Sequence, residues 1–287
     1  MDLFLQLLVN GIVNGSHYAL LGIGFGLIFG TTNIVHFAYG PVYTLAAYVA
    51  WAAATFLGLP VPLAALVGVA AAAAAGVLSY LGLYRPFVVR QAPTFVVLIA
   101  SLGLFILLEN AIAILFGTDK KVVEGYSAGI HFIGPAFFTD IHIYQLLGLV
   151  LIGGALALFL RLTSYGKAIQ AMTDNAEMAR VIGIDTVKVS VLVFALGSAI
   201  SAVPAVLILL RDGALPNMGF IAVFVAFLAV VVGGVGSIKG AVLGGFLLGL
   251  VENVGMWQIP TEWQSTIAFV VLFLVLLVRP QGLFRGS

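Results

Sequence analysis

The chain has 287 residues, of which 62% are hydrophobic and only 8% are charged, and its net charge is +1. Soluble domains carry about a quarter charged residues, so these charges are too few to cover a water-facing surface. Lipid is therefore expected to surround most of the chain, which leaves helices or a closed barrel as the possible folds. Barrel strands would alternate over about ten residues, whereas the apolar runs here extend over roughly 16 to 27 residues, the length of membrane-spanning helices. The near-neutral charge gives no indication of nucleic-acid binding.

Hydropathy divides the chain into nine apolar segments separated by short polar stretches. The second, seventh and eighth are short for a full crossing, and short glycine-interrupted segments can be half-helices covered by other helices. The sequence therefore predicts an all-α polytopic integral membrane protein, with one transmembrane domain over residues 1–287 and roughly eight to ten helices. The nine segments are residues 3–29, 42–57, 62–83, 94–116, 144–160, 189–210, 220–235, 241–256 and 265–278.

Positively charged residues predict the orientation, because cytoplasmic loops carry an excess of Lys and Arg. Arg85 and Arg90 place segment 84–93 inside, and Arg279 and Arg285 place the C-terminus in the cytoplasm. Segment 161–188 is also rich in Lys and Arg and is placed inside. Segment 117–143 mixes Lys with Asp and Glu and is placed outside. Nine spans then put the N-terminus outside.

Glycine is abundant, with 34 residues, and is concentrated inside the apolar segments. Two runs stand out, at residues 22–30 and 233–249. Small residues allow helix backbones to approach closely in lipid, so tight packing is the first interpretation. A flexible, gated helix pair is the alternative.

The polar segment 161–188 contains a predicted helix with one weakly apolar stripe of small residues at helical spacing. Such a stripe packs poorly into lipid but fits a groove on another protein, so partner docking is favoured over a helix lying on the membrane surface. Gly183 can end this helix. The candidate docking residues are Gly166, Ala168, Ala171, Asn175, Ala176, Ala179 and Gly183.

The sequence contains no recognisable motif for catalysis, metal binding or nucleotide binding. No phosphate-binding GxxxxGK[ST] loop is present, so this chain alone is not expected to use ATP. The four histidines are scattered and no HExxH pattern occurs, which predicts no metal site. The absence of cysteine excludes disulfides and thiolate ligands. We expect no catalytic residues and no cofactor bound by this chain.

Two acidic residues, Glu109 and Glu252, fall within apolar segments, and the predicted topology places both in the outer third of the membrane. A carboxylate at such depth usually faces the protein interior or a water-filled cavity. Each could cap a neighbouring helix, or both could line an outer vestibule. Asn10, Asn14, Ser16 and His17 of the first segment are further candidates for the wall of a translocation pathway.

Several motifs along nearly the whole chain resemble the permeases of bacterial branched-chain amino acid ABC importers, in particular the type that pairs with a second, similar permease. Segments 166–184, 233–238 and 278–284 carry the most specific part of the likeness, and segment 166–184 matches the family's ATPase-docking loop. The matching residues are Asn10-Gly11, Gly15-Ser16, Tyr18-Ala19-Leu20, Tyr84-Arg85-Pro86, Ser101-Leu102-Gly103, Gly166-Lys167-Ala168, Asn175, Ala179, Gly183-Ile184, Gly233-Gly234-Val235-Gly236-Ser237-Ile238 and Val278-Arg279-Pro280-Gln281-Gly282-Leu283-Phe284.

This resemblance implies a heteromeric importer in the bacterial plasma (inner) membrane. Its partners would be a second homologous permease, two ATPase subunits that use ATP and Mg, and an extracytoplasmic substrate-binding protein. Relatives that carry urea, amides or aromatic acids leave the substrate open. A self-contained secondary transporter or channel is the alternative, although a docking helix would then have no partner.

The chain departs from the family pattern at two places. The family usually has Asn-Phe-Ala-His-Gly-Glu after the first span, whereas this chain has His36-Phe37-Ala38-Tyr39-Gly40-Pro41. The second departure is Lys239, which stands where the family has proline. His36 and Tyr39 are therefore added to the pathway candidates, since a change there could alter specificity.

Overall fold

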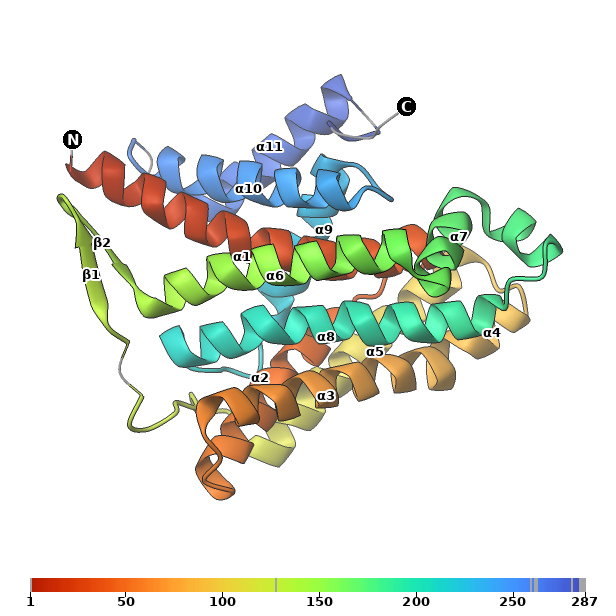
Figure 1. The fold of residues 1–287 in the computed structure, drawn as a ribbon, viewed down its shortest axis with the longest axis horizontal. Coiled ribbons are helices and arrows are strands. Elements are labelled where there is room, and N and C mark those ends of the chain that lie inside the picture. Colours follow the sequence, from red (N-terminus) through yellow and green to blue (C-terminus); the bar gives the residue numbers. More distant parts are fainter. Residues whose placement is uncertain (1, 127, 259, 261–262, 280, 284–287) are drawn as a thin grey trace.

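The computed structural model describes residues 2–126, 128–258, 260, 263–279 and 281–283. Helices dominate this part of the chain (Figure 1). The described elements are α1 (Asp2–Thr32), α2 (Tyr39–Phe56), α3 (Val61–Ser79), the π-helix η1 (Tyr80–Tyr84), α4 (Arg85–Val89), α5 (Thr94–Phe116), β1 (Ile130–Ile133), β2 (Ala136–Thr139), α6 (Asp140–Leu162), α7 (Ser164–Val181), α8 (Thr186–Asp212), α9 (Met218–Gly233), α10 (Ile238–Gly255) and α11 (Gln264–Val278).

The all-α prediction is confirmed, and each of the nine apolar segments coincides with a helix. Six helices of the described chain are long and apolar enough to cross a membrane, and two shorter apolar helices lie at Met218–Gly233 and Thr266–Val278. The prediction that segment 241–256 is too short for a crossing is wrong. Helix α10 begins at Ile238, where Ser237 accepts a hydrogen bond from the Gly240 backbone N–H at 3.0 Å, and it reaches 18 residues.

Helix α1 is the central element of the fold, and it packs against α8, α9 and α10. Of its most apolar window, 72% is buried, against 17% for α5 and 22% for α6. The peripheral helices therefore present most of their apolar side chains outward, as lipid contact requires. The central position of α1 brings its polar residues into the interior of the protein.

Glycine allows the close contact between α1 and α10. A Cβ atom added to Gly249 would meet the backbone of Gly15, and one added to Gly245 would meet the backbone of Ala19. A Cβ on Gly15 would in turn lie 2.9 Å from the Cα of Phe246. These contacts confirm the interpretation of the glycine runs as packing surfaces.

Replacing Gly249 by Val is expected to lower the thermal stability of the purified protein, because α1 and α10 would have to separate. Overpacking of this kind costs about 1–3 kcal/mol. The measurement is the midpoint of thermal unfolding in detergent. Gly103→Val is the control, since no heavy atom lies within 4 Å of a Cβ built on Gly103. Equal midpoints for the two variants would contradict this account of the helix contact.

A short β-hairpin, which the sequence analysis did not predict, covers one end of the helices. Strands β1 and β2 pair antiparallel around Gly134, whose φ of 58° suits a residue without a side chain. The Gln6 side chain of α1 pairs with the edge of β2 by donating to the Phe137 carbonyl at 3.1 Å and accepting from its N–H at 2.9 Å. The hairpin is thereby attached to the start of α1.

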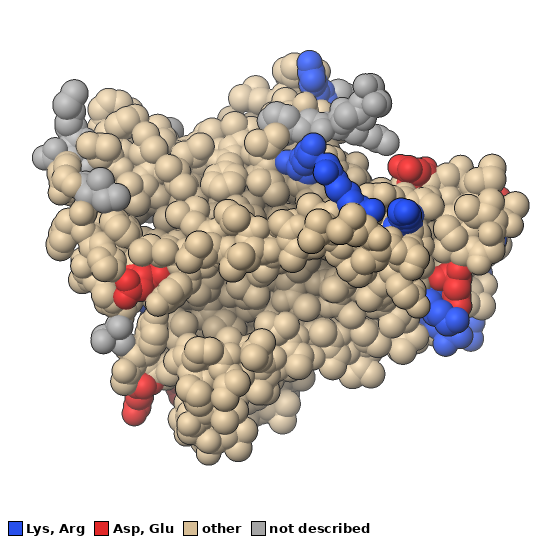
Figure 2. Space-filling view, viewed as in Figure 1, with Lys and Arg blue, Asp and Glu red and all other residues tan. Residues whose placement is uncertain are grey.

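The segments that lie at each end of the helix bundle are those that the sequence predicts to share a side of the membrane. Helices α4 and α7 lie at one end and the β-hairpin at the other (Figure 1), so segments 84–93 and 161–188 share a side opposite to segment 117–143. Segment 84–93 is largely helical rather than a loop. On the face drawn in Figure 2, Lys and Arg gather toward the α7 end, as expected of a cytoplasmic side.

The last described residues also lie at the α7 end. The Leu283 N–H donates to the Val232 carbonyl at 2.9 Å, beside the turn that connects α9 and α10. Pro280, Phe284, Arg285 and Ser287 lie outside the described residues. The cytoplasmic location of the C-terminus stays a prediction.

Candidate functional site

Two neighbouring cavities lie beside α1 and α8, toward the end that carries the hairpin. We call them the outer cavities, because the sequence predicts that this end faces outward. Their volumes are 360 Å³ and 220 Å³, and Asn14 and Arg211 belong to the walls of both. The larger cavity is further lined by His17, Tyr18, Leu21, Tyr43, Ile208, Met218, Ile221, Ala222 and Val225. The smaller is further lined by Asn10, Val13, His142 and Asp212. The volume of the larger cavity falls within the range of about 300–1,000 Å³ that is typical of small-molecule sites.

The charged part of these walls comes from the last turn of α8. Arg211 donates from Nε and Nη2 to Oδ2 of Asp212, at 2.9 and 2.7 Å. Both side chains remain accessible, with 30% of Arg211 and 53% of Asp212 exposed. Gly213, with φ of 79°, ends the helix directly after them and turns the chain toward α9. The charged pair is therefore held at the rim of the two cavities.

The structure brings together three of the predicted pathway residues of α1. Asn10, Asn14 and His17 occupy successive turns of one helix face, and each lines at least one of the two cavities. His17 is buried, and its Nδ1 has no hydrogen-bond partner among the described residues. Ser16 points elsewhere, since it is buried and donates to the Val13 carbonyl at 2.7 Å.

The structure places His36 and Tyr39 in the packed interior, where neither lines a described cavity. His36 Nδ1 shares a hydrogen bond of 2.8 Å with the Tyr84 hydroxyl, which in turn contacts Ser101 Oγ at 2.8 Å. The Tyr39 hydroxyl donates to the Leu21 carbonyl at 2.9 Å. These contacts tie α1, α2, η1 and α5 together, so the observed contacts of both residues are structural.

The two acidic candidates are separated by the fold. Glu252 is 3% exposed and accepts a hydrogen bond from the Tyr18 hydroxyl at 2.7 Å. It lines a third cavity of 180 Å³ with apolar residues of α9 and α11, next to the larger outer cavity. Glu109 lies half-buried on α5 and lines none of the described cavities. Only Glu252 therefore adjoins the outer cavities.

Helix α7, which contains the predicted docking residues, is two helical pieces joined at Asn175. The Asn175 backbone is extended, with φ of −158° and ψ of 100°, and its Oδ1 caps the second piece by accepting from the Met178 N–H at 2.9 Å. This break was not predicted, because the stripe was interpreted as one continuous helix. Gly183, with φ of 92°, follows the end of the helix as expected.

Several residues of the predicted stripe pack against other parts of this chain and are therefore not free to contact a partner. Gly166 and Ala179 are buried, and Ala168 and Ala171 pack against the hydrophobic core. Ala176 is half-buried and Asn175 is exposed. The large hydrophobic side chains that face outward here are Tyr165 near the start of α7, with 53% exposed, and Met178, Val181 and Ile182 at its end, with 58%, 77% and 68% exposed. Most of the exposed apolar side chains therefore lie on the second piece of α7 and just after it, rather than along the whole stripe.

Asp185 fixes the start of α8 directly after this surface. Its Oδ1 accepts from the backbone N–H groups of Lys188 and Val187, at 3.1 and 3.2 Å. These hydrogen bonds, above all the one from Lys188, hold the pKa of the Asp185 carboxyl below its ordinary value. The cap thus stabilises the first turn of α8.

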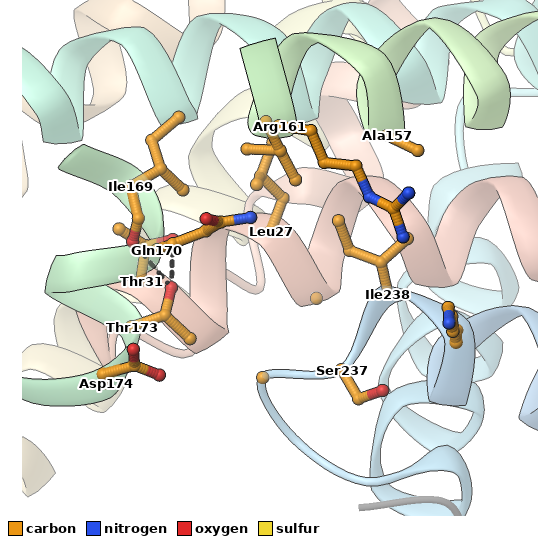
Figure 3. Close-up of a pocket in the computed structure, with 14 residues that line it drawn as sticks. Leu27, Thr31, Ala157, Arg161, Ile169, Gln170, Thr173, Asp174, Ser237 and Ile238 are labelled. Carbon is orange, nitrogen blue, oxygen red and sulfur yellow. Dashed lines mark hydrogen bonds between the residues drawn. The ribbon is translucent and has the colours of Figure 1, made fainter. Parts of the chain in front are cut away.

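A cavity of 320 Å³ is lined by residues of α7, of the ends of α1 and α6, and of the start of α10 with the turn before it. Figure 3 shows Gln170 and Asp174 of α7 on one side of it and Ser237 and Ile238 on the other, with the Arg161 side chain extending toward Ile238. Thr31 of α1 and Thr173 of α7 join their hydroxyls at 3.2 Å. The proposed docking segment therefore contacts the central helix that also lines the outer cavities.

Sequence reasoning missed Arg211 and Asp212. The available signal was an Arg-Asp-Gly sequence at the end of the apolar run 189–210, on the side predicted to be outside. Positive charge is depleted there, so an arginine in that place marks a candidate site. Among the described residues, no group of three His, Asp or Glu side chains could hold a metal ion.

Comparison with known proteins identifies the family. The family described as "branched-chain amino acid transport system / permease component" matches residues 7–276. The chain belongs to this family. It is 35% identical to the high-affinity branched-chain amino acid transport system permease protein BraD of Pseudomonas aeruginosa, over 98% of this chain and 95% of that protein. It is 34% identical to the permease protein LivH of Escherichia coli, with the same coverage.

More distant proteins share the fold. A probable branched-chain amino acid permease of Methanocaldococcus jannaschii is 26% identical over 97% of this chain and 91% of its own length. The solved structure of PsaBC from Streptococcus pneumoniae in complex with Fab covers 97% of this chain and 92% of the matched chain, with a TM-score of 0.52 and 13% identity. This second likeness concerns the fold alone. The chain is a multi-pass membrane protein of the permease family.

Proposed function

We propose that this chain is the membrane-spanning permease subunit of an ABC importer for branched-chain amino acids in the bacterial inner membrane. The observation that carries the proposal is identity of 34–35% over 98% of the chain to permeases named for that substrate. The accessible outer cavities on α1 and α8 are consistent with a pathway that begins between these helices.

The proposed complex contains parts that this chain does not supply. A second, homologous permease would complete the pathway, an extracytoplasmic binding protein would deliver the amino acid, and two ATPase subunits would use ATP and Mg. The sequence of this chain has no nucleotide-binding loop. The exposed apolar residues of α7, at the end rich in Lys and Arg, are the proposed contact with the ATPase.

The proposed function predicts ATP-dependent uptake of leucine into lipid vesicles that contain the whole complex, with the binding protein outside. Omitting this chain from the reconstitution is expected to abolish uptake. The measurement is the accumulation of radiolabelled leucine with ATP enclosed. Uptake that continues without ATP would support a self-contained transporter instead, and absence of uptake of leucine, isoleucine and valine would overturn the assigned substrate.

A further inference from the structure

The two outer cavities adjoin at Asn14 and Arg211, and they differ in that the smaller has charged and amide walls and the larger has an aliphatic side. Asp212, Asn10 and Asn14 surround the smaller cavity. The larger one has an aliphatic side formed by Leu21, Ile208, Ile221, Ala222 and Val225, and His17, Tyr18 and Tyr43 also belong to its wall. Arg211 and Asn14 stand where the two meet, since both line both cavities. A ligand that fits this arrangement has a charged head and an uncharged aliphatic tail.

The charged pair at the rim keeps hydrogen-bonding capacity for a ligand. Arg211 uses Nε and Nη2 on a single oxygen of Asp212, and among the described residues neither Nη1 of Arg211 nor Oδ1 of Asp212 takes part in a hydrogen bond. The substantial exposure of both side chains makes them reachable from water. A guanidinium binds a carboxylate with paired N–H donors, and a carboxylate accepts from an ammonium.

A buried polar atom in the larger cavity also points to a ligand. His17 is only 8% exposed and lines the cavity, while its Nδ1 is without a partner among the described residues. Buried polar groups are normally hydrogen-bonded, directly or through water. The amide groups of Asn10 and Asn14 can turn either a donor or an acceptor toward a bound head group.

We propose that the joined cavities bind a zwitterionic aliphatic α-amino acid in transit. Arg211 binds the carboxylate, Asp212 binds the ammonium, and the side chain lies against Leu21, Ile208 and Val225. This inference rests on the proposed function and deepens it, because it names the residues that bind the two charges of the amino acid. It also assigns a ligand-binding role to two residues at the end of α8.

Saturation-transfer NMR on the complex in lipid nanodiscs, without the binding protein, tests the assignment. The probes are L-leucine, 3-methylbutylamine, which lacks the carboxylate, and 4-methylpentanoate, which lacks the ammonium. We expect leucine to bind roughly tenfold more tightly than either analogue, because each loses one charge-assisted contact.

Variants test whether Arg211 binds the carboxylate of the ligand and Asp212 binds its ammonium group. Arg211→Gln is expected to weaken leucine binding roughly tenfold and to remove the preference for leucine over 3-methylbutylamine. Asp212→Asn should remove the preference over 4-methylpentanoate in the same way. Arg211→Lys keeps the charge but loses the paired N–H donors of the guanidinium, so its affinity for leucine should lie between those of wild type and Arg211→Gln. Arg90→Gln is the matched control, because Arg90 is exposed at the opposite end of the bundle.

The inference is overturned if wild-type protein gives no transfer to leucine or binds the three compounds equally. It is also overturned if Arg211→Gln and Arg90→Gln bind leucine alike. Size-exclusion chromatography of each variant complex checks assembly, and Arg211→Lys carries the test if the glutamine variant does not assemble. ATP-driven leucine uptake by the wild-type complex distinguishes a failure of this inference, which leaves uptake intact, from a failure of the proposed function.

Discussion

Replacing Ala176 by Asp is expected to abolish ATP-driven uptake while leaving the membrane core folded. Ala176 is half-buried at the start of the second piece of α7, two residues before the exposed side chain of Met178. If this surface docks into a groove of the ATPase, the substitution places a carboxylate without a partner in the interface, at a cost of several kcal/mol. A loss of that size exceeds a hundredfold in the binding constant of the subunit.

The measurement is co-purification of the ATPase with the tagged permease, followed by uptake in vesicles. Ser164→Asp is the control, because it adds the same charge at an exposed position in the first turn of α7, where the helix dipole favours it. Normal uptake by Ala176→Asp would show that this surface is not the docking site. A size-exclusion profile like that of wild type separates lost docking from misfolding.

The same experiment bears on the orientation of the chain. ATP-hydrolysing subunits work in the cytoplasm, so an ATPase held at α7 places α4 and α7 inside and the β-hairpin outside. Ala171→Asp is a poorer test of docking than Ala176→Asp. Ala171 packs against the hydrophobic core, and a charge there would disturb the permease itself.

The positions of the helices could be predicted because the length and hydropathy of a segment largely determine whether it forms a helix in lipid. Each apolar run must become a helix to satisfy its own backbone, and the glycine spacing of α1 and α10 indicates how closely they approach. The β-hairpin and the break at Asn175 could not be predicted in this way. Both involve individual hydrogen bonds, between Gln6 and Phe137 of β2 and from the Met178 N–H to Asn175, and such bonds leave no periodic pattern in the sequence.

The candidate site likewise contains some residues that the sequence predicts and others that it does not. Asn10, Asn14 and His17 were predicted because they are polar residues inside an apolar run, on one helix. Arg211 and Asp212 were missed because they end a different span, and only the packing of α8 beside α1 brings them to Asn14. His36 and Tyr39 were selected for departing from a family pattern, yet their contacts lie within the protein core.

Replacing Glu252 by Gln is expected to reduce uptake roughly tenfold without loss of assembly. The buried Glu252 carboxylate accepts from Tyr18, and Tyr18 lines the larger outer cavity. Glutamine keeps the size and one oxygen acceptor but removes the charge, which weakens a charge-assisted hydrogen bond that holds the wall of the cavity. The expected result is slower leucine uptake with an unchanged subunit composition and unchanged basal ATP hydrolysis.

Glu109→Gln is the matched control, since it makes the same chemical change on α5, away from every described cavity. Uptake by this variant is expected to equal that of wild type. Equal uptake by both variants would mean that Glu252 needs no charge and that its contact with Tyr18 serves packing alone. Failure of the Glu252→Gln complex to assemble would lead to the same structural assignment, because burial of Glu252 between α9, α10 and α11 makes it a candidate for holding those helices together.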